Sequence, residues 1–157
     1  MTLPLCAPLE RFLAVQERSL ATGRLRQMAA YYQTPLPVED LTADGEWLVL
    51  KTQRDVLHQI EAMYRPLRGR RVQVKHETHA VRYDGSARAW LHTDLVARRG
   101  DGRDVYRIEK EMYCAVCGHG CRVEMLRILS SKPPMEVLGL GAGRRPPFSD
   151  RRFPKLH

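Results

Sequence analysis

Residues 72–95 read VQVKHETHAVRYDGSARAWLHTDL, and this stretch decides the fold. Apolar and polar side chains alternate through two runs, which is the pattern of β-strands with one buried face. Asp84-Gly85 stands between the runs, and this dipeptide is a strong signal for a two-residue hairpin turn. The stretch therefore predicts an antiparallel hairpin, the first in a series of strands that extends to about Ser130.

The turn sets the expected register of this hairpin. With Tyr83 opposite Ser86, counting outward gives one polar face, on which the expected pairs are His79 with Trp90, Glu77 with His92 and Lys75 with Asp94. The other face carries Val72, Val74, His76, Thr78 and Ala80 beside Ala89, Leu91, Thr93 and Leu95. We predict that this second, largely apolar face packs on the core.

Two further turns continue the sheet with the same alternation. The turn around residues 100–102 places Val96 opposite Val105, and the turn around 118–120 places Cys117 opposite Cys121 and Glu111 opposite Arg127. The core face then continues through Tyr106, Ile108, Lys110, Met112, Cys114, Glu124, Leu126 and Ile128. The polar face continues through Arg107, Glu109, Glu111 and Tyr113.

The chain before residue 72 predicts amphipathic helices. Pro8 suits the first turn of a helix that ends at Gly23, and a second, shorter helix stops before Pro35. Thr52 and Asp55 resemble the capping box that begins a helix, which predicts a third one.

A short hairpin is expected between the second and third helices. Residues 36–38 form its first strand, Asp44-Gly45 its turn and residues 47–50 its second strand. The predicted order is thus two helices, a hairpin, a third helix and a run of long strands.

Composition and charge divide the chain unevenly. The 157 residues carry a formal net charge of +8, and the segment from Lys132 onward holds six Lys and Arg against two acidic residues. We expect one α+β domain over residues 1–131 and a basic, Pro- and Gly-rich arm or disordered tail over 132–157. Aromatic residues make up 7% of the chain, so nucleic acid is not an expected partner.

Targeting features point to the cytoplasm. No stretch approaches the roughly 20 apolar residues that span a bilayer, so no membrane association is expected. Residues 1–9 lack a basic start and contain Pro4 and Pro8, unlike a secretory signal. In that compartment the four cysteines are expected to be reduced thiols or metal ligands rather than disulfides.

The order of elements resembles that of the nuclear transport factor 2-like superfamily, and the SnoaL-like branch within it. Residues 30–38, AYYQTPLPV, resemble the join from second helix to first strand, and residues 45–52, GEWLVLKT, the second strand entering the third helix. The resemblance implies a cone-shaped, cystatin-like fold, in which a curved antiparallel sheet packs on three N-terminal helices. It also implies a pocket between the two layers and a homodimer. Members include isomerases, dehydratases and cyclases, and fold alone transfers no mechanism.

Polar residues on the predicted core face are the candidate site. His76 is the candidate general base, and Tyr32 or Tyr106 supplies a hydroxyl that could polarise a carbonyl. Glu124 is a candidate acid, provided that its strand stays regular. The remaining pocket-lining candidates are Thr78, Leu91, Thr93, Ile108, Lys110 and Met112. The alternative is that His76 is a hydrogen-bonded core residue and that Lys110 and Glu124 reach the rim.

Cys114, Cys117, His119 and Cys121 offer three thiols and an imidazole, the ligand types of zinc. Their spacing argues against a metal site, because all four lie on one tight hairpin and alternation sends Cys114 and Cys117 to opposite faces. Buried or turn thiols are the alternative.

His92, between two carboxylates on the polar face, is either part of a proton-transfer pair or part of a charge ladder on a solvated or dimer-forming sheet. Trp90 on the same face hints at a subunit contact. The leading functional hypothesis is binding of a small, partly apolar molecule, with cofactor-free acid–base chemistry at His76. The alternative is a non-catalytic, dimeric interaction module whose cavity is filled and whose basic tail engages a partner.

Overall fold

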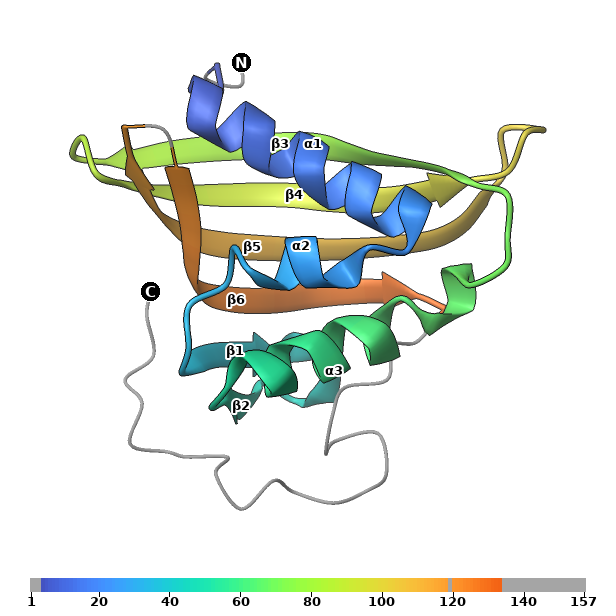
Figure 1. Ribbon diagram of the computed structural model, residues 1–157, viewed down its shortest axis with the longest axis horizontal. Coiled ribbons are helices and arrows are strands. Elements are labelled where there is room, and N and C mark those ends of the chain that lie inside the picture. The colour runs from blue at the N-terminus through green and yellow to red at the C-terminus, as the bar shows by residue number, and fades with distance from the viewer. Residues whose placement is uncertain (1–3, 119, 134–157) are drawn as a thin grey trace.

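The computed structural model describes residues 4–118 and 120–133, within which helices and strands follow one another as the sequence predicts (Figure 1). The elements are α1 Ala7–Thr22, α2 Leu25–Ala29, β1 Leu36–Asp40, η1 Leu41–Ala43, β2 Glu46–Leu50, α3 Gln53–Met63, η2 Arg65–Leu67, β3 Gln73–Asp84, β4 Arg88–Arg98, β5 Asp104–Cys117 and β6 Gly120–Lys132. The predicted tail lies outside the described residues beyond Pro133.

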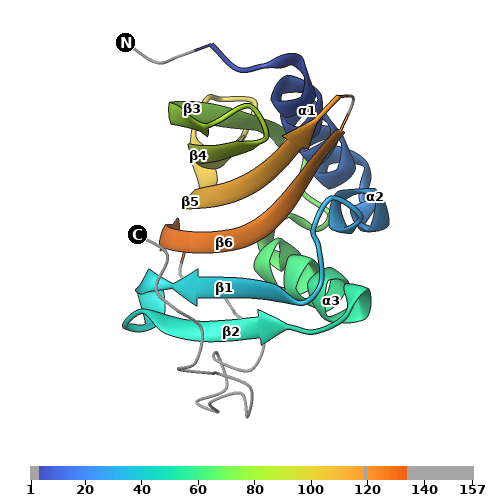
Figure 2. The ribbon, with the colours of Figure 1, turned by 90° about the vertical axis from the view of Figure 1, so that its left-hand side faces the viewer.

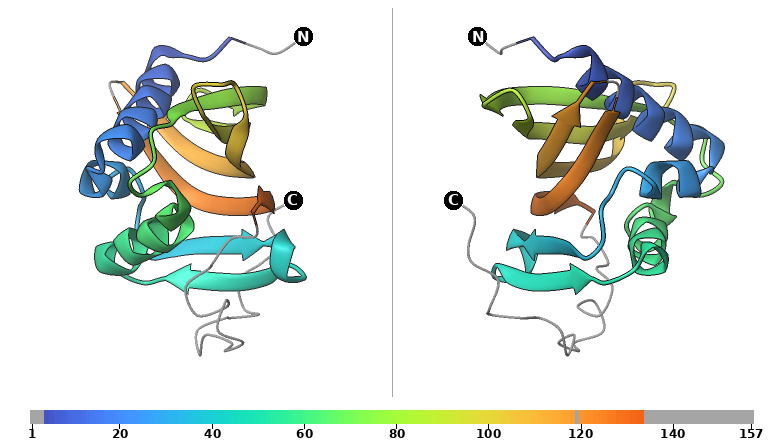
Figure 3. Two further views of the ribbon diagram at one scale, coloured as in Figure 1. Left: turned by 90° about the vertical axis from the view of Figure 1, so that its right-hand side faces the viewer. Right: turned by 60° about the vertical axis from the view of Figure 1, so that its left-hand side comes forward.

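The strands form one mixed sheet in the order β2-β1-β6-β5-β4-β3. It curves around the helices, all of which lie on one side of it (Figures 2 and 3). The predicted α+β architecture is confirmed, but the sheet is not wholly antiparallel, because β1 runs parallel to β6 with Val38 opposite Leu126. A two-stranded hairpin is marginal alone, and this pairing attaches the β1–β2 hairpin to the long strands.

Local signals begin and end the helices where the sequence predicts. Pro8 lies in the first turn of α1, which ends at Gly23 with a φ of 73°, a conformation that glycine adopts without strain. At α3 the Thr52 hydroxyl accepts the backbone N–H of Asp55, whose carboxylate accepts that of Thr52. Both orphan donors are therefore satisfied, as a capping box requires.

The β3–β4 hairpin has a different register from the one predicted. Tyr83 lies opposite Ala89 rather than Ser86, which shifts the pairing by an odd number of residues and would exchange the two faces. A β-bulge at His79, between Thr78 and Ala80, reverses that exchange for the residues that precede it.

The predicted pairs of Lys75, Glu77 and His79 are therefore wrong, although the face assigned to Lys75 and Glu77 is right. Lys75 lies opposite Val96 and Glu77 opposite Asp94. Ala80 is a second correction, since it lies opposite His92 on the face turned away from the helices and is exposed.

The other two hairpins keep their predicted faces except at Cys121 and Glu124. Val96 lies opposite Arg107 rather than Val105, an even shift that preserves the alternation. Glu111 lies opposite Arg127 as predicted. Cys121 lies opposite Val116 rather than Cys117, because a second bulge, at Glu124, changes the register of β5 and β6.

The core fills the space between the helices and the face of the sheet that they cover, the inner face. Its fully buried apolar side chains include Leu9, Phe12, Met28, Leu36, Leu50, Leu91, Leu95, Ile108 and Met112. Burying each such side chain contributes about 1.5–3 kcal/mol. Within the described residues no helix has the length and apolar character that crossing a membrane requires.

Candidate ligand site on the inner face of the sheet

His76 lies on the inner face, as predicted, and is held there by helix α1. Its side chain is 1% exposed, and its Nδ1 lies 3.0 Å from Oε2 of Glu17. The same carboxylate oxygen accepts the backbone N–H of His76 at 2.7 Å. These two bonds outweigh the effect of burial on Glu17 and lower the pKa of its carboxyl.

Burial lowers the pKa of His76 to about 4. The hydrogen bond that the imidazole donates to Glu17 opposes this shift, and the charge of Lys110 adds to it. The imidazole is therefore neutral at pH 7, and because Glu17 accepts from Nδ1, we assign its proton to that nitrogen. Nε2 then carries a lone pair, and among the described residues it has no hydrogen-bond partner. This is the arrangement of a base oriented by a carboxylate.

Lys110 lies in the middle of β5, opposite Thr93, and is 1% exposed. Its Nζ donates to the hydroxyl of Tyr64 at 3.5 Å. Burial lowers the pKa of this amine to about 8. A buried lysine with such a pKa is a chemically competent base or nucleophile, and it is costly to keep in an apolar interior.

Lys110 borders a small cavity of about 20 Å³. This cavity has room for about one water molecule. Its other lining residues are Met28, Tyr32, Leu36, Leu50, Val56, Gln59, Ile60, Met63, Tyr64 and Leu126. The space between sheet and helices is thus nearly filled at this point.

The hydroxyls of the inner-face tyrosines Tyr32 and Tyr106 form hydrogen bonds within the core. The hydroxyl of Tyr32 donates to Oε1 of Gln16 at 3.2 Å, and that of Tyr106 donates to the backbone oxygen of Met63. Burial raises the pKa of both phenols. Tyr64 also has a raised pKa from burial, and it is the tyrosine that contacts Lys110.

Other predicted pocket residues are packed rather than open. Leu91, Ile108 and Met112 are fully buried in the core, and the Thr93 hydroxyl donates to the backbone oxygen of Glu77 at 3.1 Å. Thr78 is half-buried.

Glu124 is a correction. The bulge turns its side chain to the outer face, away from the helices, where it forms an ion pair with Arg88 at 2.6 Å.

A larger cleft of about 480 Å³ opens beside this site, where the end of α1, the start of α2 and the segment after α3 meet. It is lined by Leu20, Ala21, Gly23, Leu25, Glu61, Tyr64, Arg65, Leu67, Arg68, Gly69, Arg70 and Val72. Tyr64 lines both the cleft and the small cavity, and its hydroxyl contacts the amine of Lys110.

Sequence reasoning missed the cleft and the partners Glu17 and Tyr64. A signal for the cleft exists in the sequence: residues 65–71, RPLRGRR, place four arginines directly after the third helix. Arg65, Arg68 and Arg70 line the cleft against one acidic residue, Glu61, which makes it positively charged.

The cysteine hairpin is described in part. Cys114 and Cys121 are buried on the inner face, and the hydrogen bond with Cys121 together with burial raises the pKa of the Cys114 thiol. Cys114 is thus a thiol at neutral pH, and whether this hairpin binds a metal stays a prediction. The side chains of Cys117 and His119 lie outside the described part of the chain.

Comparison with solved structures identifies the fold class. An NTF-2 like protein of unknown function from Shewanella oneidensis MR-1 has a TM-score of 0.57 and 12% identity, over 77% of this chain and 95% of that one. Aln2 from a Streptomyces species has a TM-score of 0.58 and 14% identity, over 81% and 93%. A protein of unknown function with a cystatin-like fold from Nostoc punctiforme has a TM-score of 0.54 and 12% identity, over 80% of this chain and 93% of that one.

The chain therefore has the cystatin-like, nuclear transport factor 2-like fold, as the sequence predicted. At these identities the likeness establishes the fold alone. Neither protein-family models nor curated proteins give a match to this sequence. The SnoaL-like branch stays a prediction.

Proposed function

We propose that this protein binds a small, partly apolar molecule with an anionic group in the cleft of about 480 Å³. The observation that carries the proposal is that Tyr64 both lines this cleft and contacts the buried amine of Lys110. The volume lies in the range of about 300–1,000 Å³ that small-molecule sites occupy.

The lining of the cleft sets the class of ligand. Leu20, Leu25, Leu67 and Val72 offer an apolar wall, and the arginines along 65–70 offer charge for a carboxylate or phosphate. A ligand of this class buries its apolar body in the cleft and leaves its anionic group on the arginine side.

Acid–base chemistry belongs to the same proposal. A ligand that displaces the Tyr64 ring meets the amine of Lys110. The charge of that amine acts on the imidazole of His76, whose Nε2 has no hydrogen-bond partner among the described residues. Glu17 fixes the orientation of that imidazole and stabilises it when it takes a proton. The chemistry needs no cofactor, and proton abstraction next to a carbonyl group is the reaction class that such residues support.

Decanoate, a carboxylate with an apolar tail, tests the proposal in calorimetric titrations of the full chain, with decanol as the uncharged comparison. We expect decanoate to bind and the double substitution R68Q/R70Q to weaken it about tenfold, or about 1.4 kcal/mol. Ala21→Trp fills the cleft from α1 and should abolish binding. Ala14→Trp, at another exposed position of α1, is the matched control. Equal binding by the Ala21→Trp variant, or none by the wild type, contradicts the proposal.

A second candidate rests on the nearly filled inner cavity of about 20 Å³. In this alternative the protein is a non-catalytic interaction module that dimerises through the outer face of the sheet. Trp90 on that face stacks with Tyr113 at 4.8 Å between ring centroids and is flanked by Arg82 and Arg127. Sedimentation of the wild type and of Trp90→Ser distinguishes the interaction module from the ligand-binding protein. A wild-type dimer that Trp90→Ser dissociates, together with no carboxylate binding, favours the interaction module.

A further inference from the structure

A second cluster of chemically capable side chains lies on the outer face, away from the cleft. The bulge in β3 creates it, because the extra residue His79 shares its place in the ladder with Ala80, opposite His92 of β4. The two imidazole rings stand 4.6 Å apart between centroids. Bulges commonly re-aim a side chain at functional sites.

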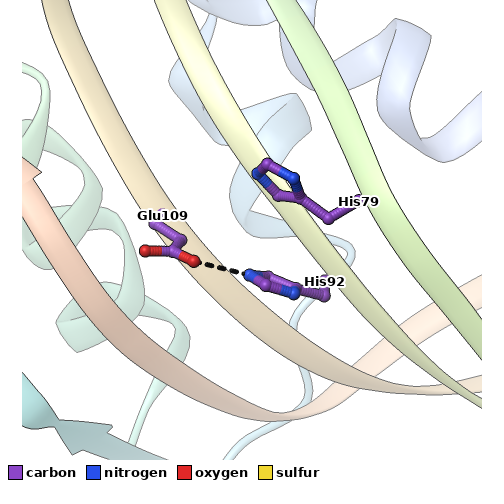
Figure 4. Close-up of side chains that lie close together, drawn as sticks. All are labelled: His79, His92 and Glu109. Atoms are coloured by element: carbon purple, nitrogen blue, oxygen red, sulfur yellow. Dashed lines mark hydrogen bonds and ion pairs between the residues drawn. The ribbon is translucent and has the colours of Figure 1, made fainter.

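Glu109 of β5 completes the cluster (Figure 4). Its Oε2 lies 2.7 Å from Nε2 of His92, and one possible ligand atom from each of His79, His92 and Glu109 lies within 4.8 Å of the others. Ligand atoms around a tetrahedral zinc ion lie about 3.3 Å apart, given bonds of about 2.0–2.1 Å. These side chains are partly exposed, so small torsional changes can close that difference.

Neighbouring side chains contact two members of the cluster, His79 and Glu109. Nε2 of His79 lies 3.0 Å from Oδ1 of Asp94, whose other oxygen binds Arg107. The hydroxyl of Ser130 donates to Oε1 of Glu109 at 3.1 Å, which leaves Oε2 toward the imidazoles. A carboxylate on a ligating histidine is a recurring outer-shell arrangement.

The cluster also differs from the charge ladder around it. Elsewhere on this face arginines neutralise the carboxylates: Arg98 and Arg107 contact Glu77, and Arg127 contacts Glu111. Within the described residues Glu109 has no such arginine, and its ionic partner is His92.

We propose that His79, His92 and Glu109 form a binding site for a divalent transition metal of the zinc class, with the remaining coordination position open to solvent. Two imidazoles and one carboxylate are a ligand set that zinc and its neighbours in the periodic table accept. The metal replaces the direct contact of 2.7 Å between Nε2 of His92 and Oε2 of Glu109.

Zinc chloride titrated into metal-stripped, untagged full-length protein tests the site by calorimetry. We expect one zinc ion per chain, at least 100-fold weaker binding in the variants H79Q/H92Q and Glu109→Gln, and 10- to 100-fold weaker binding in Asp94→Asn. His58→Gln, an exposed histidine on α3, is the matched control and should bind as the wild type does.

Cobalt chloride separates this site from the cysteine hairpin, because thiolate ligands give intense near-ultraviolet bands and imidazole and carboxylate ligands do not. We expect a cobalt spectrum without those bands, unchanged in C117S/C121S. Circular dichroism checks the folding of each variant. If H79Q/H92Q does not fold, Glu109→Gln replaces it as the test. Absence of zinc binding by the wild type, undiminished binding by Glu109→Gln, or thiolate bands that vanish in C117S/C121S overturns the proposal.

Discussion

His76 shows what a buried titratable residue does to stability. Its pKa of about 4 in the folded protein lies below the value near 6.5 expected for an unfolded chain. Between these two values the unfolded chain binds a proton that the native protein excludes. The stabilisation is therefore complete above pH 6.5 and is lost as the pH falls toward 4, by on the order of 3 kcal/mol.

Urea denaturation at pH 7.5, 6.5, 5.5 and 5.0 measures this effect. We expect the free energy of unfolding of the wild type to fall steadily over this range, and that of His76→Asn to fall much less. Asparagine keeps an amide donor for Glu17 but does not titrate. His58→Asn, on the exposed side of α3, should keep the slope of the wild type. If the free energy of unfolding of the wild type does not change between pH 6.5 and 5.0, then His76 is not buried as a neutral imidazole.

Lys110 acts on stability in the same direction as His76, but in a higher pH range, so its cost is present at neutral pH. Its pKa of about 8 in the folded protein lies below the usual value of about 10.4, so the unfolded chain binds more protons between these values and stability rises with pH. At pH 7 the buried amine carries a charge that costs on the order of 1–3 kcal/mol. A residue that costs this much is expected at a functional site.

Lys110→Met is therefore expected to be more stable than the wild type at pH 7, because methionine fills the same space without a charge. The difference should shrink by pH 9.5. Chemical denaturation at both pH values measures it, with Lys51→Met, an exposed position, as the control. A variant that is less stable than the wild type at pH 7 and at pH 9.5 means that the amine contributes to packing rather than to a site.

At the scale of elements, the sequence predicts order and faces well and register poorly. The capping box at Thr52 and the turn glycines are local signals, and the structure confirms them. The Asp84-Gly85 turn failed because the two-residue hairpin turn requires positive φ at both residues, and only Gly85, at 68°, has it. A bulge has no local signal in the sequence, because it is defined by how the residues on both sides of it pair with the neighbouring strand.

The bulge at His79 makes a deletion test possible. Removing His79 leaves Thr78 inward, Ala80 outward and Val81 inward, which is a regular alternation. We expect this deletion to keep the fold and the stability within about 1 kcal/mol, whereas deletion of Glu77 turns Lys75 inward and His76 outward and costs several kcal/mol. Thermal melting compares the two. Equal damage by both deletions shows that His79 belongs to the regular ladder.

At the scale of the whole molecule, the inner-face residues His76 and Lys110 could be assigned from alternation alone. Their partners could not, because Glu17 and Tyr64 reach them from helices far away in the chain, and helix-to-sheet packing decides those contacts. The cleft was missed for the same reason, since its walls come from two stretches far apart in the chain, residues 20–25 and 61–72.

In the proposed function a ligand enters this cleft and displaces the Tyr64 ring from the buried amine of Lys110. A crystal structure of the protein soaked with decanoate tests it most directly. We expect density for the tail along Leu25 and Val72, the carboxylate beside Arg68 or Arg70, and a rotated Tyr64 ring. Decanoate bound elsewhere on the molecule, with the cleft empty and Tyr64 still against Lys110, contradicts it.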